Sequence, residues 1–284
     1  MVHLMLEFII IILIAFLAGF MGAIFGIGGG SILVPLLDLL LPIDIHWIIP
    51  ASLICTVITA MSSNIVYLKK GLTNVRLATV LIPMSAVGAF VGTHMMMTLN
   101  QNVLRGIFGI FLLFSAYNVW RKSIKRKTST SSGKRVFKSV SSFFSDSYYD
   151  EAFGDNITYS PTNVSIGALL TFFGGFLSAL LGIGGGIINM PILLLILGLP
   201  PKAAAALSLF LISLNGAIGG TIYLVKGFVD PFIVAPAIIG ILMGVKLGTS
   251  VIISIRDVTL KKLIAIFFLI MGLRMIITAL GILG

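Results

Sequence analysis

The sequence has few charged residues: only 10% of its 284 residues are Asp, Glu, Lys or Arg, whereas 58% are hydrophobic. The mean hydropathy is +1.15. A soluble domain of this length has too small an interior to bury so much apolar surface, so lipid must be the solvent for most of it. The scarcity of charge therefore excludes a soluble globular protein and predicts an all-α polytopic membrane protein in a lipid bilayer.

Cysteine and histidine are also scarce, since the chain contains only Cys55, His3, His46 and His94. One thiol cannot form an intramolecular disulfide, and three scattered histidines lack the spacing of metal ligands. No catalytic constellation emerges from the sequence. We therefore expect no metal, no cofactor and no enzymatic activity.

The net charge is +10, which comes from 19 Lys and Arg residues against nine Asp and Glu residues. A basic protein can bind nucleic acid, but these basic residues lie mainly in short connections between apolar segments. That distribution is typical of cytoplasmic loops in membrane proteins. We therefore interpret the charge as a topology signal and expect no nucleic-acid partner.

Apolar runs near the ~20 residues that a membrane-spanning helix needs occur throughout the chain. They occupy residues 4–25, 47–68, 76–98, 102–121, 162–181, 203–225, 229–252 and 258–281. Two shorter runs, 31–42 and 187–199, would reach only about 18 Å as helices and are expected to be half-length helices. The hydrophilic, partly disordered stretch between the two sets is expected to be a plain cytoplasmic connector in a multi-pass cell-membrane protein.

The two halves of the chain align without a gap at an offset of 156 residues, which indicates internal duplication. The predicted organisation is a first membrane repeat (1–121), a hydrophilic linker (122–160) and a second membrane repeat (161–284). Each repeat should contain four long transmembrane helices and one half-length helix. The repeats are expected to be inverted, because that arrangement puts most Lys and Arg on the side of the linker, whereas parallel repeats do not.

A glycine-rich sequence interrupts the apolar runs at the same place in both repeats. The two copies are Gly26-Ile27-Gly28-Gly29-Gly30 and Gly182-Ile183-Gly184-Gly185-Gly186. Freed backbone groups are costly in lipid, so such breaks persist only where protein or water supplies hydrogen-bond partners. Duplicated breaks are typical of transporter binding sites. We expect the helix after each break to present N–H groups and a partial positive charge to a small anion.

Side chains near these breaks are candidates for further contacts with the anion. Ser31 and Asn189 follow the two glycine clusters directly and would add donors. Ser52 and Ser208 match across the repeat, and Ser52 lies on a polar stripe of its helix. Close helix packing through small residues is the alternative interpretation of the glycines. A nucleotide site is excluded, because no Lys-Ser/Thr pair follows either cluster and the glycine spacing does not fit a dinucleotide fingerprint.

Ionisable residues inside apolar segments are functional candidates by default. Lys246 and Arg274 are expected to neutralise an anion or line its exit, with snorkelling toward an interface as the alternative. Asp38 and His94 are candidates for carrying a coupling proton. Asp38 corresponds to Leu194 in the second repeat, so the symmetry is broken there.

The doubled glycine motif, the proline downstream of each copy and the central hydrophilic loop resemble the sulfite exporter TauE/SafE family, also called the toluene sulfonate uptake permease family. The resemblance covers residues 10–121 and 165–281. It implies an integral membrane transporter of sulfite, sulfonates or related small sulfur-containing anions, with substrate contacts at the motif glycines. We therefore expect an exporter that works by alternating access. The alternatives are an anion channel, a permease for another small organic anion, and a non-transporting scaffold or sensor.

Overall fold

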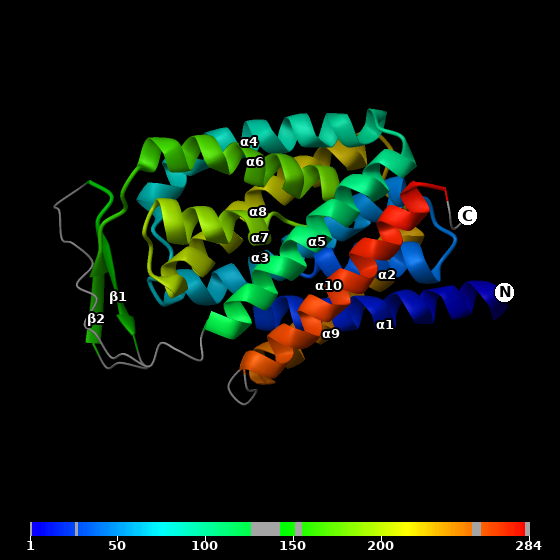
Figure 1. Ribbon diagram of the computed structural model, residues 1–284, viewed down its shortest axis with the longest axis horizontal. Helices are drawn as coiled ribbons and strands as arrows, with labels where there is room; N and C mark the ends of the chain where they lie inside the picture. Colours follow the sequence, from blue (N-terminus) through cyan, green and yellow to red (C-terminus); the bar gives the residue numbers. More distant parts are fainter. Residues whose placement is uncertain (1, 26–27, 126–142, 151–154, 252–256, 282–284) are drawn as a thin grey trace.

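A computed structural model describes residues 2–25, 28–125, 143–150, 155–251 and 257–281. It shows an elongated bundle whose long helices run roughly along one axis, with a two-stranded hairpin at one end (Figure 1). The first half contains α1 (Val2–Phe25), α2 (Gly30–Leu40), α3 (Ile45–Lys69), α4 (Val75–Thr98) and α5 (Gln101–Lys125). The second half contains α6 (Val164–Leu181), α7 (Gly186–Pro191), the π-helix η1 (Ile192–Ile196), α8 (Pro201–Val225), α9 (Pro231–Val251) and α10 (Asp257–Ala279).

The helices have the length and composition of a membrane protein. Among the described residues, α3, α4, α6 and α8 are long and apolar enough to cross a membrane. Helices α1, α5, α9 and α10 contribute shorter apolar stretches, and α2 is short as predicted. The prediction of an all-α membrane protein is therefore confirmed, with one small β-hairpin added.

Helix bounds in the second half follow those in the first at the offset seen in the sequence. Adding 156 to the bounds of α3 gives 201–225, which are the bounds of α8. The same shift of α2 gives 186–196, which α7 and η1 occupy together. In Figure 1, α1 begins at the end of the molecule marked N, and α6 begins at the opposite end, beside the hairpin.

Long helices of the two halves pack crosswise. Helix α1 packs against α9, and α6 packs against α4, while α3 pairs with α8 and α5 with α10. Glycines allow the crosswise pairs to approach closely. A Cβ at Gly19 would lie 2.7 Å from the Ile241 carbonyl oxygen, and a Cβ at Gly175 would collide with the Ser85 carbonyl. These two contacts match each other at the 156-residue offset, so the same small-residue seam is used twice.

The linker contains an ordered element that the sequence interpretation missed. Strands β1 (Asp146–Asp150) and β2 (Asp155–Tyr159) form an antiparallel hairpin. Tyr148 and Tyr159 are only 4% and 2% exposed, and they join a buried cluster with Leu77 of α4 and Leu193 of η1. The linker is therefore more than a connector, because its two tyrosines bury apolar rings against one end of the bundle. Residues 126–142 and 151–154 lie outside the described part of the chain.

Candidate functional site

The two glycine breaks meet beside α3. Ser52 Oγ donates a hydrogen bond to the Gly182 carbonyl over 2.9 Å and lies 3.5 Å from the Gly30 carbonyl. Ser52 therefore contacts both breaks, although they are about half the chain apart in sequence. The prediction that the breaks form one site with Ser52 requires this proximity.

Thr56, one helical turn after Ser52, lies between the breaks. A Cβ added at Gly28 or at Gly184 would collide with the same atom, Thr56 Cγ2. Thr56 Oγ1 donates to the Ser52 carbonyl over 2.8 Å, so its methyl group faces the glycines. The sequence places Thr56 on the polar stripe of α3, but nothing in one sequence distinguishes it from the other hydroxyls of that stripe.

Gly29 and Gly185 are required by backbone geometry as well as by packing. Each is the residue before a half-helix, with φ of 76° and 75° respectively, in the left-handed region that other residues rarely adopt. A Cβ would lie 2.8 Å from the Ala18 carbonyl oxygen at Gly29 and 2.6 Å from the Gly174 carbonyl oxygen at Gly185. Because α2 and α7 begin immediately after these residues, the first N–H groups of both helices lie at the breaks.

Buried polar atoms without hydrogen-bond partners gather at this place. Within the described part of the chain, seven buried side-chain atoms lack a partner, and five of them belong to Ser31, Ser178, Asn189 and Ser208. All four side chains are fully buried. An unsatisfied buried polar group costs about 1–3 kcal/mol, so native proteins contain few of them. Ser31, Ser178 and Asn189 lie beside the breaks, where their unpaired atoms could contact a polar ligand.

Three of these four residues are candidates from the sequence, whereas Ser178 is not. A comparison of the two repeats could have indicated Ser178, because it is the polar counterpart of Gly22. A Cβ at Gly185 would lie 3.0 Å from Ser178 Cβ, so Ser178 borders the second break. Ser208 corresponds to Ser52, so its expected partner is the carbonyl of Gly26, which corresponds to Gly182. Gly26 lies outside the described residues.

Asp38, a candidate for proton coupling, forms a buried ion pair. Arg105 of α5 donates to Asp38 Oδ1 from Nε over 3.1 Å and from a terminal guanidinium nitrogen over 2.9 Å. The side chains are 4% exposed for Asp38 and 18% exposed for Arg105. The pair ties the half-helix α2 to α5, so Asp38 has a structural role, and its part in coupling stays a prediction.

The other ionisable candidates lie apart from the buried groups at the breaks. Lys246 is exposed on α9. Arg274 is half-buried on α10, which packs chiefly against α5. His94 is exposed on α4, where its ring lies 4.4 Å from that of Phe90 and its Nδ1 lies 3.0 Å from the Phe90 carbonyl oxygen. Their roles in binding or coupling stay predictions.

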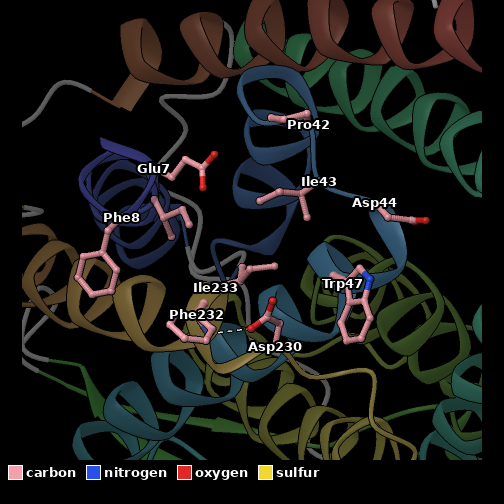
Figure 2. Close-up of a pocket in the computed structure, with 10 residues that line it drawn as sticks. Glu7, Phe8, Pro42, Ile43, Asp44, Trp47, Asp230, Phe232 and Ile233 are labelled. Atoms are coloured by element: carbon pink, nitrogen blue, oxygen red, sulfur yellow. Dashed lines mark hydrogen bonds between the residues drawn. The ribbon is translucent and has the colours of Figure 1, made fainter. Parts of the chain in front are cut away.

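The described residues of both breaks are buried, and two pockets in the described structure lie elsewhere. One pocket of about 340 Å³ lies where the start of α1 meets the α2–α3 and α8–α9 connections, lined by Glu7, Asp44 and Asp230 beside aromatic rings. Figure 2 shows the Asp44 carboxylate pointing away from those of Glu7 and Asp230. No group of His, Cys, Asp and Glu in the described residues could hold a metal ion. A second pocket, of about 250 Å³, lies between the start of α4 and the hairpin.

Comparisons with known proteins agree with this architecture. The family model described as "Sulfite exporter TauE/SafE" matches residues 11–275. The "Probable membrane transporter protein YunE" of Bacillus subtilis is 27% identical over 278 residues, which cover 95% of this chain and 98% of that protein. A "Probable membrane transporter protein" of Haemophilus influenzae is 28% identical over 295 residues, which cover 95% of this chain and 99% of that protein. No solved structure matches the chain. The chain belongs to the sulfite exporter TauE/SafE family of membrane transporters.

Proposed function

We propose that this membrane transporter exports sulfite, a sulfonate or a related small sulfur-containing anion by alternating access, and that the anion binds between the two glycine breaks. The observation that carries this proposal is the convergence of both breaks on Ser52, together with unpartnered polar atoms around them. Family membership supports transport as the activity.

The chemistry of the breaks suits an oxyanion. Two helix N-termini supply backbone N–H groups and partial positive charge without placing a full charge in the membrane interior. The hydroxyls of Ser31 and Ser208 add donors, and both are buried without a partner among the described residues. Glycine at the breaks lets the backbone itself approach the oxygens of the anion.

Two inverted repeats would give this site access from both sides of the membrane in turn. The equal helix bounds, the crosswise packing and the opposite ends at which α1 and α6 begin support an inverted arrangement. If the two repeats exchange conformations, the enclosed site opens first to one side and then to the other. The burial of the described break residues is what a closed intermediate of such a cycle would show.

Export needs no coupling ion. An inside-negative potential drives an anion outward with about 2.3 kcal/mol per charge for each 100 mV. Asp38 and His94 remain the candidates if a proton is coupled to the movement.

The test is flux of labelled sulfite in proteoliposomes that contain the full chain. An alternating-access transporter shows saturable flux and counterflow, in which unlabelled sulfite on the far side accelerates entry of the label. A channel gives flux that neither saturates nor shows counterflow, and a scaffold or sensor gives no flux. Either of those outcomes contradicts the proposal.

A further inference from the structure

The second break carries polar side chains that the first lacks. Asn189 occupies the position that corresponds to Leu33, and Ser178 occupies the position that corresponds to Gly22. Both polar residues border Gly185. A Cβ added at Gly185 would lie 3.0 Å from Ser178 Cβ. A Cβ added at Gly174, which is beside the same break, would collide with Asn189 Oδ1.

At the first break, the equivalent space is closed by apolar contacts. A Cβ at Gly22 would lie only 2.5 Å from the Gly29 nitrogen, so the helix backbone packs directly against the break. Leu33 is fully buried in the main apolar core. Polar side chains therefore lie where α6 meets α7, at positions that Gly22 and Leu33 occupy in the first repeat.

The Asn189 side-chain amide lacks hydrogen bonds within the described structure. Both its nitrogen and its oxygen are buried, and neither has a hydrogen-bond partner among the described residues. An amide nitrogen donates, whereas an amide oxygen accepts. A fully ionised oxyanion offers only acceptors, so it would satisfy the nitrogen and leave the oxygen unpaired. The complement of this side chain is a ligand that also carries a hydrogen-bond donor.

We propose that Asn189 and Ser178 form a subsite for a hydroxyl or amino group of the substrate, while the glycine breaks hold its anionic end. This inference rests on the proposed function and narrows it to short alkanesulfonates that bear a donor group on the second carbon from the sulfonate. Asn189 is then the residue that determines specificity, because its oxygen accepts from the donor group. Ser178 Oγ adds a second polar contact on the α6 side.

The test compares 2-hydroxyethanesulfonate with ethanesulfonate, which differ by one hydroxyl group. Each is used to inhibit uptake of labelled 2-hydroxyethanesulfonate into proteoliposomes that contain the full chain. We expect the wild-type protein to prefer the hydroxylated anion by roughly tenfold, because a site built to pair a hydroxyl rejects the analogue that lacks it. In Asn189→Leu the preference for the hydroxylated anion should fall below about twofold.

The repeat supplies matched controls. Asn189→Leu introduces the residue found at the equivalent position of the first half and removes unpaired polar atoms, so it should fold. Ser178→Gly, which copies Gly22, should reduce the preference by a smaller factor and provides a second variant. Ser213→Ala removes a buried hydroxyl that hydrogen-bonds to Asn64 elsewhere in the bundle and should leave the preference intact.

Two results overturn the subsite: equal inhibition of the wild-type protein by both sulfonates, or a preference that Asn189→Leu leaves unchanged. A different result overturns the proposed function itself. In that case neither sulfonate is transported, and labelled sulfite shows no saturable flux through the same preparation.

Discussion

The two half-length helices begin with the same glycine sequence but are held in different ways. Helix α2 remains α-helical from Gly30 to Leu40, and the Asp38–Arg105 ion pair anchors it to α5. The equivalent segment changes from α7 to the π-helix η1 after Pro191 and has Leu194 at the position that corresponds to Asp38. The same glycine sequence starts both half-helices, whereas the residues that follow it differ. Different contacts therefore hold the two half-helices in place.

The two half-helices also differ in the contacts that hold them and in the polar side chains beside them. The first half-helix has the ion pair and the buried hydroxyl of Ser31, whereas the second has the π-helix, the docked hairpin and the buried polar side chains of Ser178 and Asn189. Single-turn π-helices are frequent at functional sites, since one residue per turn is left without the usual α-helical bond. We therefore expect the ion pair to anchor the first half-helix, and the proposed discrimination between substrates to depend on the second.

The largest expected effect comes from closing both breaks at once. Gly29→Leu combined with Gly185→Leu should reduce sulfite flux by more than about a hundredfold, because side chains would strain the left-handed backbone and collide with carbonyls within 3 Å. Flux in proteoliposomes measures the effect, and size-exclusion chromatography checks that the protein is folded. Normal flux through the double variant would contradict a site at the breaks.

Two glycines with the same backbone conformation serve as controls. Gly71 and Gly227 correspond to each other across the repeat, have φ of 63° and 76°, and have no atom within 4 Å of an added Cβ. Gly71→Ala with Gly227→Ala should therefore keep most of the flux. Loss of flux in this control would mean that backbone strain alone explains the first result.

The next effect concerns the anchor of the first half-helix. Asp38→Leu should lower the free energy of unfolding by about 3 kcal/mol, because it leaves the Arg105 guanidinium buried without its partner. Asp38→Leu with Arg105→Met should recover most of that loss. Thermal unfolding in detergent measures both variants. If Asp38 also carries the coupling proton, the stable double variant Asp38→Leu with Arg105→Met should abolish pH-driven flux.

Much of this fold could be predicted because its signals are local or repeated. Apolar runs placed the helices, and the offset of 156 residues placed the half-helices at 31–42 and 187–199, close to where they lie. The glycines, Ser31, Asn189 and Ser208 stood out because they follow a break or match across the repeat. The structure places Ser31 and Asn189 beside the glycines, whereas Gly26, the expected partner of Ser208, lies outside the described residues.

The remaining features depend on contacts between distant segments. The Asp38–Arg105 pair joins residues 67 positions apart, and no sequence pattern links them. The hairpin gains its stability from burying Tyr148 and Tyr159 against the bundle, whereas its own residues are largely polar. Both half-helices contain a proline, yet only the second continues as a π-helix, so the proline alone does not predict this difference.

A smaller effect distinguishes the two matching serines. Ser52→Ala should lower stability by about 1 kcal/mol, because the Gly182 carbonyl loses its hydrogen bond. Ser208→Ala should change stability by less than about 0.5 kcal/mol, since its hydroxyl has no partner among the described residues. Thermal unfolding without substrate measures both. Equal losses would show that the two breaks are held alike, contrary to the comparison.

The smallest effect concerns the hairpin, which packs with the second half-helix. Burial raises the pKa of Tyr159 above its usual value near 10, nearby Asp146 adds to the increase, and a hydrogen bond with Asn74 opposes it. Docking therefore favours the neutral phenol, so it should be independent of pH below about 10 and weaken as pH rises further. Tyr159→Phe should remove that dependence.

Hydrogen exchange of residues 155–159, compared between pH 9 and pH 11 after correction for the intrinsic rate, measures the docking. The wild-type hairpin should lose protection at the higher pH, whereas the Tyr159→Phe hairpin should lose less. An identical loss in both proteins would show that Tyr159 does not control docking.

The most direct test of the account is to locate the bound anion. Selenite has the shape and charge of sulfite, and its selenium atom can be located by anomalous diffraction from crystals soaked with it. The account predicts a selenium peak between the Gly28–Ser31 and Gly184–Asn189 segments, within hydrogen-bonding reach of their N–H groups. A peak confined to Lys246, Arg274 or the pocket beside Arg76, with none at the breaks, would contradict it.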